Sequence, residues 1–251
     1  MADQVDYQLI GDDMQGVVIT LDPGEGVRAE VGAMMFMDDG IRMETSTGGG
    51  LMKGLKRIFA GESFFITSFE NEGHARAQVA FSAPYPGKII PLDLTGSPYL
   101  CQRDAYLCSA AGIEISVAFT KRLGAGFFGG EGFILQRLEG EGLAFIHAGG
   151  TIVERDLRRG ESLRVDTGCL VALQPSVDYD IKFVGGIKTA LFGGEGLFFA
   201  LLRGPGKVYL QTLPFSRLAD RVISASRASL GGSKGEVNRG GGLLGRVLGG
   251  S

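Results

Sequence analysis

Residues 158–180 read "RRGESLRVDTGCLVALQPSVDYD", and two similar stretches precede them, at residues 22–44 and 94–116. Gly24, Gly96 and Gly160 form one column of this alignment, and Ala33, Ala105 and Cys169 form another. The spacing between the first and second copies has the same value in both columns. The spacing between the second and third copies also agrees between the columns. Identical spacings in two columns indicate an internal repeat rather than chance similarity.

A second motif recurs downstream of each stretch. Residues 128–132 and 192–196 both read Phe-Gly-Gly-Glu-Gly, and residues 59–63 keep Phe, Gly and Glu in the same register. Two interpretations of the shared Glu are open. Each carboxylate accepts hydrogen bonds from backbone N–H groups of a glycine turn, or the three converge near a pseudo-threefold axis, where like charges raise a pKa or recruit a cation. The residues concerned are Glu62, Glu131 and Glu195.

Each motif is followed by two apolar runs of strand length around "ENEG", "EGEG" or "RGPG", which we interpret as hairpin turns. The 42 glycines between Val, Ile, Phe and Thr favour many short strands. The sequence therefore predicts an all-β fold, with repeats at about 16–87, 88–150 and 151–214. No such unit buries its apolar face alone, so we expect a double-stranded β-helix or β-prism of three pseudo-threefold repeats.

The pattern changes after Pro214. "FSRLADRVISASRA" places Phe215, Leu218, Val222 and Ile223 on one helical face. This spacing predicts a closing helix over about 215–228. We expect residues 1–223 to form a single β domain that includes the start of this helix. The glycine-rich residues 229–251 are predicted to form a flexible tail.

The composition indicates a folded chain, because 44% of its residues are hydrophobic and 21% are charged. The longest apolar run, Leu197–Leu202, is far shorter than the roughly 20 residues of a membrane-spanning helix. The acidic start resembles neither a secretion signal nor a transit peptide, so we expect a cytoplasmic protein. Three irregularly spaced cysteines favour reduced structural thiols over a disulfide framework.

Catalytic and metal-binding patterns are missing from the sequence. The two histidines, His74 and His147, fall in different columns of the repeat alignment, so the repeat does not bring them together to bind a metal. No Lys-Ser/Thr follows the glycine motifs, as a phosphate loop requires. We therefore expect no catalytic residue, metal or cofactor, and a protein that is not an enzyme.

The segments that lead into the glycine motifs combine basic and aromatic residues. Residues 51–61, 119–130 and 182–194 contain no acid. Apolar groups beside cations are what a surface needs in order to contact anionic lipid headgroups or a protein partner. The alternative is that the Phe side chains belong to the core and the cations form a solvated rim. The residues of this predicted surface are Lys53, Lys56, Arg57, Phe59, Lys121, Arg122, Phe127, Phe128, Lys188 and Phe192, with Lys182 and Leu191 beside them.

The chain resembles the altered-inheritance-of-mitochondria (AIM-type) family over roughly residues 14–223. The resemblance rests on the triplicated layout, the "GGEG" copies and "DTGCLVALQPSVDYDI", and it is most specific over residues 185–214. It implies a double-stranded β-helix fold like that of the tryptophan RNA-binding attenuation protein, a tendency to oligomerise, and no known catalytic residue. For mitochondrial relatives it implies a link to inner-membrane organisation.

These observations predict a non-catalytic, self-associating protein that acts as a scaffold or as a peripheral membrane-binding module. We expect a homo-oligomer, a trimer or a dimer, because open β units must cover or pair their edges. The alternative is a groove between repeats that binds a small ligand or nucleic acid. A net charge of −3 disfavours nucleic acid.

Overall fold

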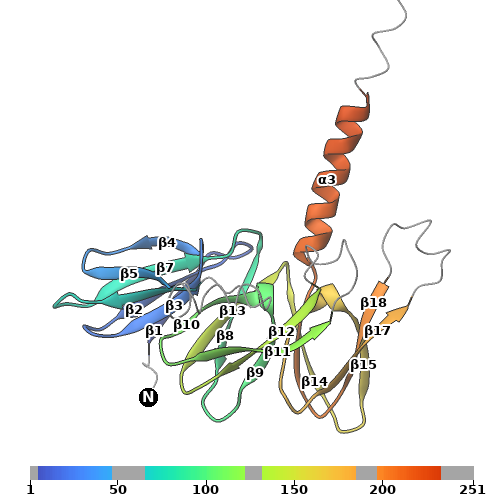
Figure 1. The fold of residues 1–251 in the computed structure, drawn as a ribbon, viewed down its shortest axis with the longest axis horizontal. Helices are drawn as coiled ribbons and strands as arrows, with labels where there is room; N and C mark the ends of the chain where they lie inside the picture. Colours follow the sequence, from blue (N-terminus) through green and yellow to red (C-terminus); the bar gives the residue numbers. More distant parts are fainter. Residues whose placement is uncertain (1–4, 47–65, 122–131, 185–196, 233–251) are drawn as a thin grey trace, which may run out of the picture. The chain divides into compact units, whose positions relative to one another are not determined.

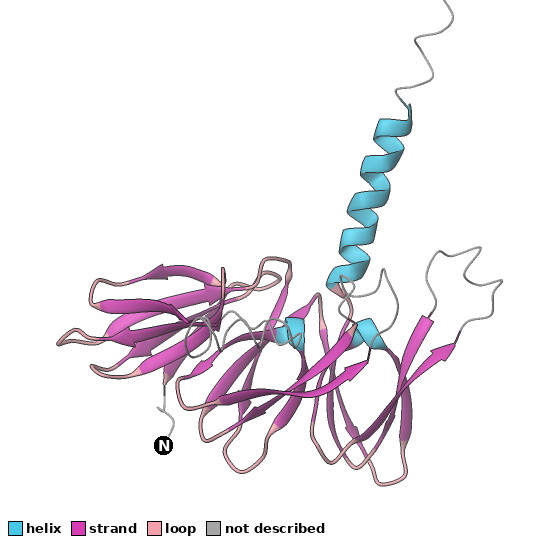
Figure 2. Cartoon of the chain, in the orientation of Figure 1, coloured by secondary structure: helices cyan, strands magenta, loops and turns pink. Residues whose placement is uncertain are grey.

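The computed structural model describes residues 5–46, 66–121, 132–184 and 197–232. The chain divides into two units, Met1–Pro214 and Phe215–Ser251, and each is described by itself. The described part of the first unit is mostly β-strand, and the second unit begins with a helix (Figures 1 and 2). The predicted all-β class is confirmed for the first unit, whereas the β-prism or double-stranded β-helix arrangement stays a prediction.

The strands after β1 (Asp6–Ile10) fall into three successive sets. The N-terminal set is β2 (Gly16–Leu21), β3 (Gly26–Glu30), β4 (Met34–Met37), β5 (Ile41–Ser46), β6 (Ile66–Asn71) and β7 (Ala77–Ser82). The middle set is β8 (Gly87–Asp93), β9 (Tyr99–Gln102), β10 (Tyr106–Ala110), β11 (Glu114–Lys121), β12 (Phe133–Glu139) and β13 (Leu143–Gly149). The C-terminal set is β14 (Ile152–Leu157), β15 (Ser162–Asp166), β16 (Leu170–Leu173), β17 (Asp178–Val184), β18 (Leu197–Arg203) and β19 (Gly206–Gln211). Short 3₁₀ helices precede β10 (η1, Arg103–Ala105) and β16 (η3, Thr167–Cys169).

The strands form four antiparallel sheets. The N-terminal sheet has the order β1-β2-β7-β4, and the C-terminal sheet has the order β15-β18-β17. Between them in sequence order are two six-stranded sheets with the same plan, β5-β6-β3-β10-β13-β8 and β11-β12-β9-β16-β19-β14. Each six-stranded sheet joins strands of two successive sets, through the β3–β10 pair in the first and the β9–β16 pair in the second.

The glycine column found in the sequence occupies one kind of turn, between the first and second strands of each set. Gly24, Gly96 and Gly160 have φ angles of +87°, +81° and +82°. A Cβ atom added at any of the three positions would meet nothing within 4 Å. Glycine is therefore required by backbone conformation and not by close packing.

Irregularities of pairing recur at the same spacings as the glycines. The third strand of each set has a register shift against the last strand of that set, between Met34 and Phe36, between Tyr106 and Cys108, and between Leu170 and Ala172. A tight backbone turn follows each of these strands, closed by hydrogen bonds from Ile41, Ile113 and Val177 to Asp38, Ala110 and Gln174. Turn and bulge thus stand at the same places in all three sets.

The prediction of three hairpins around "ENEG", "EGEG" and "RGPG" is wrong. Strands do flank these turns, but each turn carries the chain from one sheet into another: β6 pairs with β3 and β5, whereas β7 pairs with β2 and β4. Within the three sets, the neighbours in sequence that do pair are β5 with β6, β11 with β12, and β17 with β18. Turn residues specify a reversal of direction, but they do not specify which strand becomes the partner.

The core explains why several strands are apolar without alternation. Successive residues of β9 and β16 face two different hydrophobic clusters: Tyr99 packs in one and Leu100 in the other, and Val171 and Leu170 divide in the same way. A sheet covered on both faces requires apolar residues at every position. The second six-stranded sheet therefore separates two cores, one built mainly from the first two sets and one from the last two.

The second unit begins with helix α3 (Phe215–Gly232), which ends four residues beyond the predicted 228. On the predicted apolar face, Phe215 is 52% exposed and Val222 is 61% exposed. Within the residues that the structure describes, no helix is long and apolar enough to cross a membrane. The predicted tail lies outside the described residues from residue 233 onward.

Candidate interaction surface

Most of the predicted site residues lie outside the described residues. This holds for the three glutamates, Glu62, Glu131 and Glu195, and for Lys53, Lys56, Arg57, Phe59, Arg122, Phe127, Phe128, Lys188, Leu191 and Phe192. Lys121 is the last residue of β11. Lys182 lies on β17, where its Nζ is 3.6 Å from Asp180 Oδ2 and both side chains are exposed. The predicted contact of this surface with a membrane or a partner stays a prediction.

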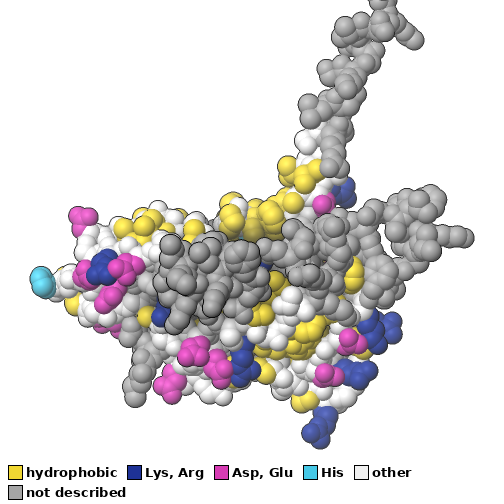
Figure 3. All heavy atoms as spheres, in the orientation of Figure 1, with side chains coloured by type: hydrophobic (Ala, Val, Ile, Leu, Met, Phe, Trp, Pro, Cys, Tyr) yellow, Lys and Arg dark blue, Asp and Glu magenta, His cyan; other side chains and the backbone are white. Residues whose placement is uncertain are grey.

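The described residues contain an apolar strand that the fold does not cover. Met34, Met35, Phe36 and Met37 make up all of β4, and each is between 37% and 49% exposed. The corresponding strands β10 and β16 are buried at every position. Hydrophobic side chains gather over the end of the β unit that carries β4 (Figure 3). A contiguous exposed apolar patch of this kind is a candidate interaction surface.

β4 also presents a backbone edge. It lies at one end of the N-terminal sheet and pairs with β7 alone among the described strands, with Phe36 opposite Ala80 and Met37 opposite Val79. An edge strand carries a row of N–H and C=O groups ready to pair with another chain, and proteins usually protect it with charge or proline. β4 has neither within its four residues.

A second edge lies on β15, at one end of the C-terminal sheet. Among the described strands β15 pairs with β18 alone. Its side chains differ from those of β4, since Val165 is buried while Ser162 and Arg164 are exposed. β15 therefore combines one exposed arginine, Arg164, with an open backbone edge among the described strands.

Acidic residues follow β4 in the turn to β5. Asp38 and Asp39 are both exposed. Asp38 Oδ2 accepts a 2.8 Å hydrogen bond from the backbone N–H of Gln78. Gln174, which occupies the place of Asp38 in the turn after β16, accepts a bond of the same length from the backbone N–H of Lys207. The turn after β4 is thus held by the same kind of hydrogen bond as the turn after β16, although β4 itself is exposed.

The buried thiols among the described residues are protonated. Burial raises the pKa of the Cys101 thiol to about 12 and the pKa of the Cys108 thiol well above its usual range, so neither is a thiolate at neutral pH. In the part of the chain that the structure describes, no group of three His, Cys, Asp or Glu side chains is arranged to hold a metal ion.

One buried histidine among the described residues has a ring nitrogen without a hydrogen-bond partner. His147 on β13 is 3% exposed, and its Nδ1 has no hydrogen-bond partner among the described residues. Its ring packs edge to face on Tyr85, with ring centroids 4.6 Å apart. Burial lowers the pKa of His147 to about 4, although a hydrogen bond with the Tyr85 backbone opposes the shift. The imidazole is therefore neutral at physiological pH and packs as an aromatic side chain.

The sequence carries a signal for the β4 surface outside the glycine motifs. Alignment on Ala33, Ala105 and Cys169 sets "MMFM" beside "YLCS" and "LVAL", three uninterrupted apolar or small runs. Such runs predict burial on both faces. Only the pairing of strands reveals that one of the three lacks its cover.

The fold and the sequence were compared with those of known proteins. A crystal structure of a Streptococcus pyogenes protein from a structural genomics project has a TM-score of 0.74 and 24% identity, covering 88% of this chain and 100% of that one. At this identity the likeness shows the fold alone, and it does not support the resemblance to the tryptophan RNA-binding attenuation protein. No match was found among curated proteins. A family model described as "Mitochondrial biogenesis AIM24" matches residues 7–213, so the chain belongs to the AIM24 family.

Proposed function

We propose that this protein is a non-catalytic scaffold that self-associates, and that its β unit consists of three repeats, one for each set of strands. The recurrence of positive-φ glycines, bulges and turns at the same spacings along the chain supports the repeats. Contact with anionic membranes and binding in an inter-repeat groove stay predictions, because the residues proposed for the first lie mostly outside the described ranges.

The single observation that carries self-association is the exposure of β4. Completing the burial of four Met and Phe side chains that are about 40% exposed contributes roughly 1 kcal/mol each. Association costs about 4–15 kcal/mol of lost freedom. Side-chain burial alone therefore does not suffice, and a stable assembly also needs the backbone edge of β4 to pair.

Sedimentation velocity of the full chain over a range of micromolar concentrations tests this proposal. We expect species heavier than the 26.5 kDa monomer, with a distribution that shifts to larger species as concentration rises. A variant with Met35→Glu and Phe36→Glu, the β4 variant, should be monomeric.

A matched control carries Val117→Glu and Val153→Glu. Both valines are exposed apolar residues on strands at the ends of the second six-stranded sheet, β11 and β14. This control should assemble as the wild type does. A wild-type chain that sediments as a monomer at every concentration would overturn the proposal.

A further inference from the structure

Two of the edge strands in the described sheets, β4 and β15, are complementary. In both six-stranded sheets, the second strand of one set pairs with the third strand of the next set: β3 with β10, and β9 with β16. Among the described strands, this pairing is missing for one third strand, β4, and for one second strand, β15. Among these strands, β4 therefore lacks a second strand as its partner, and β15 is a second strand that lacks a third strand as its partner.

The two existing pairs share one register. Cys108 lies opposite Ala29 in the first pair, and Ala172 lies opposite Cys101 in the second. Ser109 opposite Arg28 and Leu173 opposite Leu100 continue the two ladders. Carried over to β4 and β15 through the columns of the repeat alignment, the same register sets Phe36 opposite Val165 and Met37 opposite Arg164.

We propose that β15 of one copy pairs antiparallel with β4 of a second copy in this register. The inference rests on the proposed self-association and specifies its geometry. The new ladder would complete a six-stranded sheet of the order β17-β18-β15-β4-β7-β2, with β1 beyond β2, which extends the plan of the two sheets within the chain.

The chemistry of both edges fits this pairing. β10 and β16 are buried because a second strand covers their edge and the neighbouring set packs on their faces, and β4 has the same apolar character without that cover. Across the proposed ladder, exposed Arg164 would lie opposite Met37 and diagonal to Asp39, within reach of its carboxylate. The opposite charges of Arg164 and Asp39 thus meet at one end of an apolar ladder.

The occupant of β4 is a second copy rather than the β15 of the same chain. Within the β unit, β4 and β15 lie at opposite ends, with the two six-stranded sheets between them (Figure 1). The interface is heterologous, since each copy offers a different surface to each neighbour. Each addition leaves one β4 and one β15 edge open, so growth stops only when a ring closes, and otherwise it gives a filament.

Complementation between two blocked variants tests the proposal. The β4 variant keeps an intact β15. A β15 variant, Ser162→Glu with Arg164→Glu, keeps an intact β4 and changes two exposed side chains. Carboxylates on both blocked edges repel each other, so a blocked β4 cannot pair with a blocked β15. Lys182→Glu, on the other edge strand of the same sheet, is the matched control.

We expect each variant alone to be monomeric by native mass spectrometry, an equimolar mixture of the two to form a dimer with one copy of each, and the Lys182→Glu control to assemble like the wild type. Unchanged thermal unfolding of both variants shows that they are folded. If the wild type assembles but the mixture stays monomeric, or if the β15 variant assembles normally, the head-to-tail pairing is wrong while self-association stands. A monomeric wild type would overturn both.

Discussion

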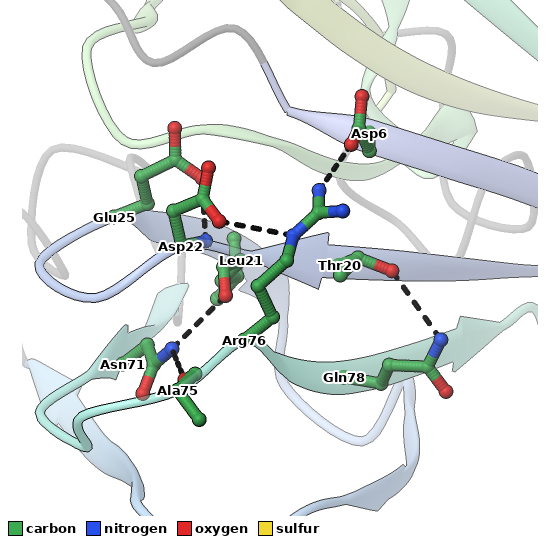
Figure 4. Close-up of polar contacts among 9 residues, drawn as sticks. All are labelled: Asp6, Thr20, Leu21, Asp22, Glu25, Asn71, Ala75, Arg76 and Gln78. Atoms are coloured by element: carbon green, nitrogen blue, oxygen red, sulfur yellow. Dashed lines mark hydrogen bonds and ion pairs between the residues drawn. The ribbon is translucent and has the colours of Figure 1, made fainter.

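The side-chain amide of Asn71 donates a 2.9 Å hydrogen bond to the backbone carbonyl of Leu21, although 50 residues separate them in sequence (Figure 4). Asn71 ends β6 and Leu21 ends β2, so the bond links the first six-stranded sheet to the N-terminal sheet. The same amide donates to Ala75 at 2.9 Å and accepts from the Gly73 N–H at 3.0 Å. One buried side chain thus fixes the turn that carries the chain between two sheets.

Replacing Asn71 should destabilise the β unit strongly. Asn71→Ala leaves the Leu21 carbonyl without its buried partner, and also removes the part-buried bonds to the Ala75 carbonyl and the Gly73 N–H, which together costs about 2–3 kcal/mol. Gln78→Ala is the control, because Gln78 is exposed and its amide makes one 3.3 Å bond to Thr20. Urea denaturation should show the control within about 0.5 kcal/mol of the wild type. Equal losses for the two variants would refute the role given to Asn71.

His147 should make stability depend on pH. Its pKa is about 4 in the folded protein and 6.5 ordinarily, so between these values the unfolded chain binds more protons. The free energy of unfolding therefore falls as pH drops from about 6.5 to 4, by up to about 3 kcal/mol. His147→Phe keeps the aromatic packing on Tyr85 and removes the titration, so its advantage over the wild type should grow as pH falls through this window. Denaturant unfolding at pH 4.5 and pH 7 measures the difference.

Glu30 changes the pH dependence of stability in the opposite direction. The contribution of His147 is therefore measured by comparing the His147→Phe variant with the wild type. Loss of water, with a smaller contribution from the Asp104 carboxylate, raises the pKa of Glu30 from 4.5 to about 7, and Arg103 opposes the shift. The folded protein then binds more protons between these values, so this contribution to stability is lost as pH rises. A His147→Phe variant with the same pH dependence as the wild type would show that His147 is not the group responsible.

Two glycine substitutions should lower the free energy of unfolding by different amounts, and for different physical reasons. Gly96→Ala meets only backbone strain at φ +81° and should cost about 1 kcal/mol. At Gly87, a Cβ atom would lie 2.1 Å from the carbonyl oxygen of Ala148 and 2.5 Å from His147 Nε2. Gly87→Ala should therefore reach or exceed the upper end of the usual range of about 1–3 kcal/mol for overpacking. Thermal unfolding that ranks Gly96→Ala as the more harmful change would contradict this assignment.

The three cysteine thiols should differ in how readily a thiol reagent reaches them. Cys101 and Cys108 are buried and have raised pKa values, whereas Cys169 is partly exposed. Thiol titration with a coloured disulfide reagent should modify at most one cysteine in the folded protein and all three in denaturant. Rapid modification of two or more in the native state would mean that the two buried cysteines are accessible.

The sequence predicted the strands better than their partners. Apolar runs and glycine turns are local signals, so the all-β class and the column of Gly24, Gly96 and Gly160 could be found without coordinates. The partner of a strand is a long-range property: nothing local in "ENEG" distinguishes a hairpin from the passage of β6 into β7 in another sheet. The exposure of Met34–Met37 was hidden for the same reason, since it depends on the absence of a second strand beside them among the strands that the structure describes.

Disulfide trapping tests the central claim most directly. In a Cys169→Ser background, a chain with Met37→Cys is mixed with a chain with Arg164→Cys under mild oxidation; residues directly opposite in antiparallel strands lie within disulfide reach. The paired control replaces the second chain with Lys182→Cys. We predict a cross-linked mixed dimer from the first mixture and little from the second. Equal yields from the two mixtures, or a predominance of Met37→Cys chains linked to each other, would contradict the pairing of β15 with β4.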